Sequence, residues 1–228
     1  MDARPAIDLR GLVRRYGERA ALDGVSVQVP EGATLVVFGP NGAGKSTLLR
    51  VLATLLRPHA GEARVLGEQL PERDWAVRGR VGLLAHDALL YRDLSARENL
   101  RFHARLHRVP EARIEELLER TRLAGRADDP VRTLSRGLLQ RVAVCRAVLH
   151  DPPLLLLDEP RANLDPAASE LIEPLIGRAS GRTRVVTSHD PAGGLAEADL
   201  ALGLRDGRVA LLAPAGEVGT AAVEELYR

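Results

Sequence analysis

Lysine is almost absent from this sequence. Lys45 is the only lysine, and every other residue in the combined count of 32 Lys and Arg is an arginine. The lysine ammonium is a compact point charge that fits between two phosphate oxygens, whereas the guanidinium of arginine is a wide planar fork. A chain this biased towards arginine has therefore kept lysine at a position where arginine cannot replace it.

Cysteine and long apolar segments are also scarce. Cys145 is the only cysteine, which excludes an internal disulfide and suits a reducing cytosol. Its apolar neighbours predict a buried structural thiol rather than a nucleophile. No apolar stretch reaches the ~20 residues of a membrane-spanning helix, and no signal-peptide pattern opens the sequence. If the protein acts at a membrane, we expect another chain to supply the spanning helices.

The charges show no excess of either sign. The formal net charge is +1, with acidic and basic residues mixed along the chain, so the composition gives no broad attraction to nucleic acid or to an anionic membrane. Asn, Gln, Met and Cys together number only eight, a bias that fits a thermophile and equally a GC-rich genome. Because amides are rare, the three that fall within the motifs below are informative: Asn41, Gln140 and Asn163.

The strongest motif surrounds the single lysine. Residues 39–47 match the phosphate-binding pattern G-x-x-x-x-G-K-[ST], in which glycines let backbone N–H groups close on phosphates. Lys45 then reaches the terminal phosphates, and the Ser46 hydroxyl binds Mg²⁺. The context agrees, because residues 34–38 predict a strand and residues 48–56 a helix. We predict a nucleoside triphosphate site made by Gly39, Pro40, Asn41, Gly42, Ala43, Gly44, Lys45, Ser46 and Thr47.

The rest of the chain alternates between strand and helix patterns. We expect short strands at residues 7–9, 21–22, 25–29 and 62–65, buried strands at 154–157 and 184–187, and helices from about 93 to 150. Ser95, with Glu98 three residues later, predicts a capping box at the start of the helical segment. The alternation predicts one α/β unit over residues 1–228, with a mainly parallel sheet and a helical insertion at about 87–150.

Two acids follow the apolar run at residues 154–157. Asp158 is placed at the strand end to hold Mg²⁺ through water, and Glu159 to polarise the attacking water as a general base. Alone, a strand that ends in Asp-Glu is a weak signal, because an ordinary strand-to-loop transition has the same pattern. The phosphate loop earlier in the chain favours the catalytic interpretation.

A second anion-binding pattern lies between the phosphate loop and the two acids. Ser135 and Gly137 open a predicted helix, and a serine hydroxyl, a glycine backbone and a helix N-terminus together bind anions. Five motifs now occur in order: the phosphate loop, Ser135-x-Gly137, the leucines with Asp158 and Glu159, Asn163-Leu164-Asp165, and Thr187-Ser188-His189-Asp190. In order and spacing, and over essentially its whole length, the sequence resembles the ATP-binding-cassette (ABC) ATPases.

The resemblance implies a fold and a set of roles. The fold is an α/β phosphate-loop NTPase with a mainly parallel sheet core, an N-terminal antiparallel β subdomain and an inserted helical subdomain. Tyr16 lies where an aromatic ring stacks on adenine, although a lone tyrosine near an N-terminus more often packs in a strand. Ser135 and Gly137 correspond to the signature that contacts the γ-phosphate bound by the opposite subunit. Glu159 and His189 correspond to the catalytic glutamate and the switch histidine.

The resemblance also implies partners and cofactors. Asp165 belongs to the loop that crosses the interface of a homodimer, which binds ATP and Mg²⁺. The dimer would lie on the cytoplasmic side of the cell membrane and drive a membrane-spanning permease, with no nucleic acid involved. Repair-type relatives carry long coiled-coil insertions and ribosomal types usually carry two cassettes, and neither feature is present here. A phosphate-loop kinase would not explain Ser135-x-Gly137.

The sequence departs from the family pattern in the signature and at His86, and the second departure bears on the cargo. Arg136 and Leu138 replace a glycine and the glutamine of the usual Leu-Ser-Gly-Gly-Gln signature. His86 lies where most relatives have a glutamine that senses Mg²⁺ and water, which is similar to the ATP-binding subunit of the haem exporter of cytochrome c maturation. The prediction is therefore haem export, with a drug, lipid or polysaccharide exporter as the alternative. His103 and His107, spaced i, i+4, are interpreted as a solvated helix face rather than a metal or haem clamp.

Overall fold

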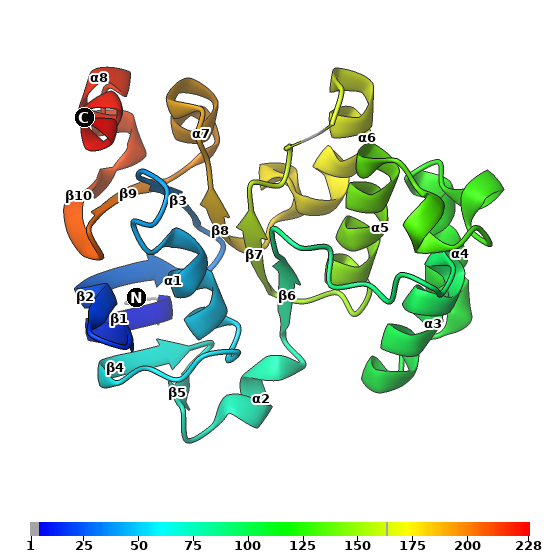
Figure 1. Cartoon of the computed structure of the whole chain (residues 1–228), viewed down its shortest axis with the longest axis horizontal. Helices are drawn as coiled ribbons and strands as arrows, with labels where there is room; N and C mark the ends of the chain where they lie inside the picture. Colours follow the sequence, from blue (N-terminus) through cyan, green and yellow to red (C-terminus); the bar gives the residue numbers. More distant parts are fainter. Residues whose placement is uncertain (1–4, 163) are drawn as a thin grey trace.

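The centre of the molecule is a six-stranded sheet whose inner strands run parallel. The computed structural model describes residues 5–162 and 164–228, and the strand order is β10-β9-β3-β8-β7-β6, with only β10 antiparallel to its neighbour (Figure 1). All residues of β3, β7 and β8 are buried, as expected for parallel strands covered on both faces. The strands are β3 (Thr34–Phe38), β6 (Val81–Leu84), β7 (Leu154–Asp158), β8 (Thr183–Thr187), β9 (Leu200–Arg205) and β10 (Arg208–Pro214). The predicted α/β class with a mainly parallel sheet is confirmed.

A second, antiparallel sheet is formed by strands on both sides of β3 in the sequence. Its order is β2-β1-β4-β5, from β1 (Pro5–Tyr16), β2 (Arg19–Pro30), β4 (Ala60–Val65) and β5 (Glu68–Leu70). The prediction of three short strands at residues 7–9, 21–22 and 25–29 was wrong, because two twelve-residue strands form one hairpin. The register of the hairpin shifts near Gly11 and Gly24, both at positive φ, so these glycines act as bulges within strands rather than as strand ends.

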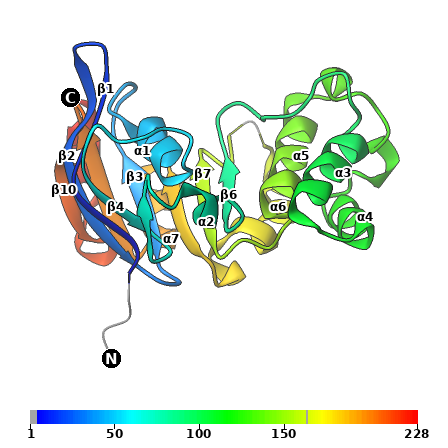
Figure 2. The ribbon, with the colours of Figure 1, turned by 90° about the horizontal axis from the view of Figure 1, so that it is seen from below.

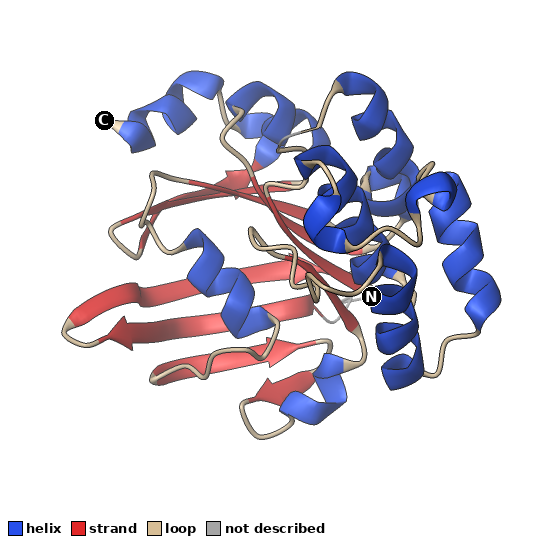
Figure 3. Ribbon diagram, turned by 45° about the vertical axis from the view of Figure 1, so that its right-hand side comes forward, coloured by secondary structure: helices blue, strands red, loops and turns tan. Residues whose placement is uncertain are grey.

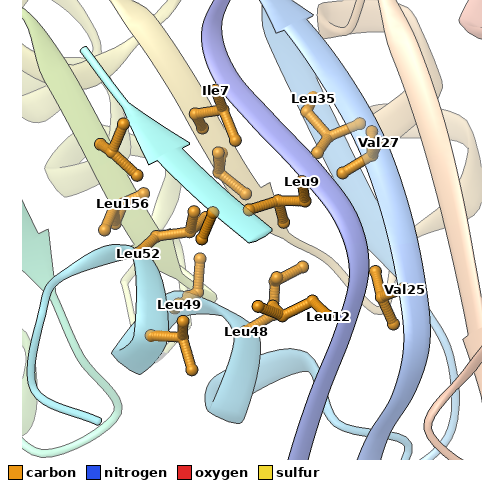
Figure 4. Packing of buried hydrophobic residues seen from close by; sticks show 14 of the residues in the cluster. Ile7, Leu9, Leu12, Val25, Val27, Leu35, Leu48, Leu49, Leu52 and Leu156 are labelled. Carbon is orange, nitrogen blue, oxygen red and sulfur yellow. The ribbon is translucent and has the colours of Figure 1, made fainter. Parts of the chain in front are cut away.

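The first hydrophobic core lies between the two sheets and around α1 (Lys45–Leu52). Figure 4 shows Leu48, Leu49 and Leu52 of this helix among side chains of the antiparallel sheet and of β3 and β7. Each fully buried leucine contributes roughly 1.5–3 kcal/mol of transfer free energy. The helix begins three residues earlier and ends four residues earlier than the segment 48–56 predicted, because the chain leaves helical geometry at Thr54, whose φ is +60°. The core therefore fixes the helix that follows the phosphate loop.

Helices form a separate layer beside β6 and β7 (Figure 2). Three of them, α3 (Ala96–His107), α4 (Glu111–Arg120) and α5 (Arg136–Val148), lie between β6 and β7 in the chain, and α6 (Pro166–Ile176) packs against α5. Ser95 and Glu98 form both hydrogen bonds of the predicted capping box. Cys145 is fully buried, and burial raises the pKa of its thiol to about 11, which confirms a structural role. In Figure 3 the strands gather on the left, and most of the helices lie above them and to their right.

Short elements complete the structure. They are α2 (Asp74–Arg78), α7 (Pro191–Glu197), α8 (Thr220–Glu224) and the 3-10 helices Ala124–Arg126, Val131–Thr133, Arg178–Ser180, Ala215–Glu217 and Glu225–Tyr227. α8 and the last 3-10 helix cover β3 and β9 with a third apolar cluster that contains Phe38 and Leu226. Among the described residues, no helix is both long and apolar enough to cross a membrane.

Candidate active site

The predicted phosphate loop connects the end of β3 to the start of α1, so the strand and the helix flank it as expected. Gly39, Gly42 and Gly44 have φ values of +141°, +81° and +109°. A Cβ atom on Gly39 would lie 2.2 Å from the carbonyl oxygen of Leu204, and one on Gly44 would lie 2.3 Å from that of Ala21. Only glycine fits at Gly39 and Gly44, and it allows the loop backbone to stay close to the sheet and to approach an anion closely.

The Lys45 side chain curls back over this loop. Its Nζ atom donates to the carbonyl oxygens of Gly39, at 2.6 Å, and of Pro40, at 3.1 Å, and only 7% of the residue is exposed. Burial lowers the pKa of Lys45, while the nearby Glu159 and Asp158 carboxylates act in the opposite direction. The ammonium of the only lysine in the chain is thus held at the centre of the loop.

Asp158 joins three elements through hydrogen bonds. Its Oδ2 atom accepts from the Ser46 hydroxyl at 2.9 Å and its Oδ1 atom from the Thr187 hydroxyl at 2.7 Å. Carboxylate and hydroxyl oxygens are the ligands that Mg²⁺ prefers, so Ser46 and Asp158 form a fitting donor set for that ion. The sequence analysis gave Thr187 no role of its own. Its hydroxyl also accepts from the backbone N–H of Glu159, at 3.0 Å.

Glu159 contacts the predicted switch histidine. Its Oε1 atom lies 2.6 Å from Nε2 of His189, which follows β8. The backbone of Glu159 has a φ of +50°, an unfavourable conformation for a residue with a side chain, and such strain is commonly found at functional sites. The turn after β7 therefore directs this carboxylate towards the histidine and is held there by Thr187.

A cleft of about 420 Å³ brings most of the predicted residues together. It is lined by Tyr16, Arg19, Ala21, Asn41, Gly42, Gly44, Lys45, Ser46, Thr47, His86, Asp158 and Glu159. Tyr16, at the end of β1, is 46% exposed, which suits a stacking platform better than strand packing. Arg19 was missed by the sequence analysis, although it pairs with Tyr16 across the hairpin and donates to the carbonyl oxygen of Gly42.

The lining of this cleft does not include seven of the predicted residues: Gly39, Pro40, Ala43, Ser135, Gly137, Asp165 and His189. Ser135 caps α5 by accepting from the backbone N–H of Leu138, and Gly137 is in the first turn of that helix. Their predicted contact with a nucleotide requires a second copy of the chain and stays a prediction. His189 lines a neighbouring cavity with Glu159. Asp165 caps α6 through the backbone N–H of Ala168, and Asn163 lies outside the described residues.

His86 stands where two cavities meet. It is exposed and lines the nucleotide cleft, and it also lines a second cavity of about 330 Å³ with Arg136, Gln140, Asp158 and Glu159. This places it between the acidic pair and the helix that carries Ser135. His86 therefore shares one cavity with both motifs: with the acids Asp158 and Glu159, and with Arg136 of the signature.

The prediction that His103 and His107 form a solvated helix face was wrong. His103 and His107 are not on a solvated face, because α3 turns them towards the end of α5, where the rings of His107 and His150 stack with centroids 4.0 Å apart. Burial lowers the pKa of His103 and of His150 to about 4. Within residues 5–162 and 164–228, no group of three or more His, Cys, Asp or Glu residues is arranged to hold a metal ion.

Comparison with known proteins agrees with this geometry. A family model described as ABC transporter matches residues 22–162, and the chain belongs to that family. It is 42% identical over 186 residues to the daunorubicin resistance ATP-binding protein DrrA3 of Streptomyces coeruleorubidus, covering 79% of this chain and 59% of the relative. It is 40% identical over 191 residues to the Nod factor export ATP-binding protein I of Ralstonia nicotianae, covering 81% and 60%. The chain thus spans about 60% of the length of these curated relatives.

Solved structures give the same result for the fold. A dimeric ATP-binding cassette in a post-hydrolysis state, bound to ADP and Pi, superposes with a TM-score of 0.83 at 27% identity, covering 92% of this chain and 98% of the other. An ATP-binding subunit of an ABC transporter gives 0.85 at 26% identity, covering 97% and 99%. The predicted ABC ATPase fold is confirmed, and the family together with this neighbour supports ATP hydrolysis by the domain.

Proposed function

We propose that this chain is the ATP-hydrolysing part of an ABC transporter. The observation that carries the proposal is the cleft in which Lys45, the Ser46–Asp158 pair and Glu159 meet. His189 contacts the Glu159 carboxylate from the neighbouring cavity. Backbone N–H groups within residues 41–47 bind the phosphates, and the Lys45 ammonium neutralises the charge that develops on the terminal phosphate. Tyr16 stacks on the adenine.

Hydrolysis in this cleft requires a base and a means of orienting it. The Glu159 carboxylate accepts a proton from the attacking water, and the imidazole of His189 holds that carboxylate in place. Ser46 and Asp158 hold Mg²⁺, which neutralises phosphate charge when bound. Thr187 fixes both acids, since its hydroxyl contacts the side chain of Asp158 and the backbone of Glu159.

We further propose a homodimer and a membrane-spanning partner. Ser135 and Gly137 do not reach the cleft of their own chain, so a second copy is needed to place them on a nucleotide, and a neighbour in fold is a dimer. The relatives are named as export and resistance proteins, which supports a permease partner and a position at the cytoplasmic face of the membrane. The net charge of +1 gives no reason for a nucleic-acid partner.

The cargo has two candidates. His86, together with Arg136 in the signature, supports haem export. The names of the relatives, with daunorubicin resistance in one and Nod factor export in another, support the drug, lipid or polysaccharide alternative. We favour that alternative because this chain is 40–42% identical to these two relatives. The cargo is bound by the permease in either case.

Both levels of the proposal can be tested on the purified protein. Phosphate release from Mg²⁺-ATP should be measured first on the chain alone, and absence of turnover would contradict the ATPase assignment. The neighbouring genes should then be searched for a permease, and that permease reconstituted with the chain in vesicles, so that turnover can be compared with daunorubicin and with haem. Stimulation by haem alone would reverse our preference between the two cargoes.

A further inference from the structure

The 3-10 helix Glu225–Tyr227 is anchored next to the phosphate loop. Leu226 is 6% exposed and packs in one cluster with Phe38 of β3. β9 has a glycine where this side chain rests, because a Cβ atom on Gly203 would lie 2.6 Å from Cδ1 of Leu226. Gly203 is paired in the sheet with Phe38, which directly precedes the phosphate loop. The seat of Leu226 therefore fixes the next residue, Tyr227, beside the start of that loop.

The Tyr227 hydroxyl bridges two loops of the site. Its oxygen accepts from the backbone N–H of Gly39 at 3.3 Å and donates to the carbonyl oxygen of Ser188 at 3.5 Å. Both distances are at the long end of the hydrogen-bond range, so each contact is weak. Together they connect the first residue of the phosphate loop with the residue before His189.

The bridge leads directly to the hydrolytic pair. The rings of Tyr227 and His189 have centroids 6.3 Å apart with planes tilted by 52°, and Nε2 of His189 reaches the Glu159 carboxylate at 2.6 Å. His189 is 42% exposed at its side chain, so packing alone does little to hold it. The backbone on its N-terminal side is held by Tyr227 and by the hydrogen bond from Ser188 N to the carbonyl oxygen of Val37.

We propose that Tyr227 is a positioning residue for ATP hydrolysis, which keeps His189 within reach of Glu159 by tying the switch loop to the phosphate loop. The inference rests on the proposed roles of Glu159 and His189. Tyr227 itself contacts no reacting atom, and its hydroxyl acts through the backbone of the loop that carries the histidine. The expected effect therefore falls on turnover rather than on ATP affinity.

The test removes only the hydroxyl. Tyr227→Phe in the full chain should lower kcat about twofold to tenfold, the size expected for weak hydrogen bonds, with KM for ATP and the melting temperature unchanged. Tyr91→Phe is the matched control, because Tyr91 is also exposed but packs on Phe102 in the helical layer. In the background His189→Ala, the change Tyr227→Phe should have no further effect, since both would act through one group.

The kinetic results for these variants decide whether the inference stands. Wild-type kcat in Tyr227→Phe overturns the inference, as does a rise of KM at constant kcat, which would make the hydroxyl a nucleotide contact. An equal further loss of kcat in the His189→Ala background overturns the route through the histidine. Wild-type turnover in both His189→Ala and Glu159→Gln overturns the proposed function itself, and the inference with it.

Discussion

The Ser46 hydroxyl donates to the carboxylate of Asp158 across 2.9 Å, although 112 residues separate the two in the chain. Ser46 is the second residue of α1, and Asp158 is the last residue of β7. Their contact joins the phosphate loop to the acidic pair without any ligand. The two proposed magnesium donors are therefore brought together by the fold itself, which would lower the cost of organising the site when the ion binds.

Replacement of Lys45 by alanine should weaken ATP binding by about tenfold to a hundredfold, because hydrogen bonds to charged groups contribute about 1.5–3 kcal/mol. Turnover should be abolished with it, since no other lysine exists in the chain. Titration with a fluorescent nucleotide measures the change. Arg50→Ala, an exposed residue of the same helix, is the control, and unchanged ATP affinity in Lys45→Ala would remove lysine from the site.

Glu159→Gln should retain ATP binding and lose turnover by about a hundredfold or more, the range of a lost general base. The amide keeps the size of the side chain and cannot accept the proton. With hydrolysis blocked, an ATP-bound dimer should persist and elute earlier from a size-exclusion column in Mg²⁺-ATP. Glu119→Gln, an exposed position on α4, is the control, and wild-type turnover in Glu159→Gln would move the base elsewhere.

His86→Gln should leave ATPase activity of the chain within a few-fold. His86 lines the cavity that also contains Asp158, Glu159 and Arg136, but it is exposed and the proposed base is Glu159. Phosphate release from Mg²⁺-ATP by the two proteins measures the effect. A loss of about a hundredfold or more would give His86 a direct part in hydrolysis.

Stability should fall in acid because of His103 and His150. Their pKa values drop from 6.5 to about 4 in the folded chain, with burial as the main cause. Between these values the unfolded chain binds more protons, so the free energy of unfolding decreases as the pH falls from 6.5 towards 4. Urea unfolding at several pH values should show this loss, and the double variant His103→Gln/His150→Gln should reduce it. His59→Gln, outside the cluster, should retain the wild-type slope.

The sequence predicted the parts of the site that depend on local pattern. Glycines before Lys45 require a tight loop, and an apolar run before Asp158 requires a buried strand, so both predictions follow from a few neighbouring residues. The long hairpin of β1 and β2 was missed because Gly11 and Gly24 have the pattern of turns, whereas the neighbouring strands hold them as bulges. Local pattern cannot distinguish these cases.

Contacts between distant residues were also missed. The hydroxyl of Tyr227 meets Gly39 across 188 residues, and nothing near either residue in the sequence indicates the contact. The burial of His103 and His107 depends on how α3 packs against α5, and the mixture of Arg and His on α3 resembles a solvated face. Only the tertiary structure determines which side of such a helix meets a partner.

The position of β3 in the sheet has a consequence for how the protein folds during its synthesis. β3 ends at residue 38, but its partners in the sheet are β8 and β9, which begin at residues 183 and 200. During synthesis the phosphate loop emerges early and then has no neighbouring strands until most of the chain has left the ribosome. Pairings this distant fold slowly, and the unpaired edges of β3 can associate with other chains in the meantime. Until β9 has been synthesised, β3 therefore lacks at least one of the two strands that cover its edges in the folded sheet.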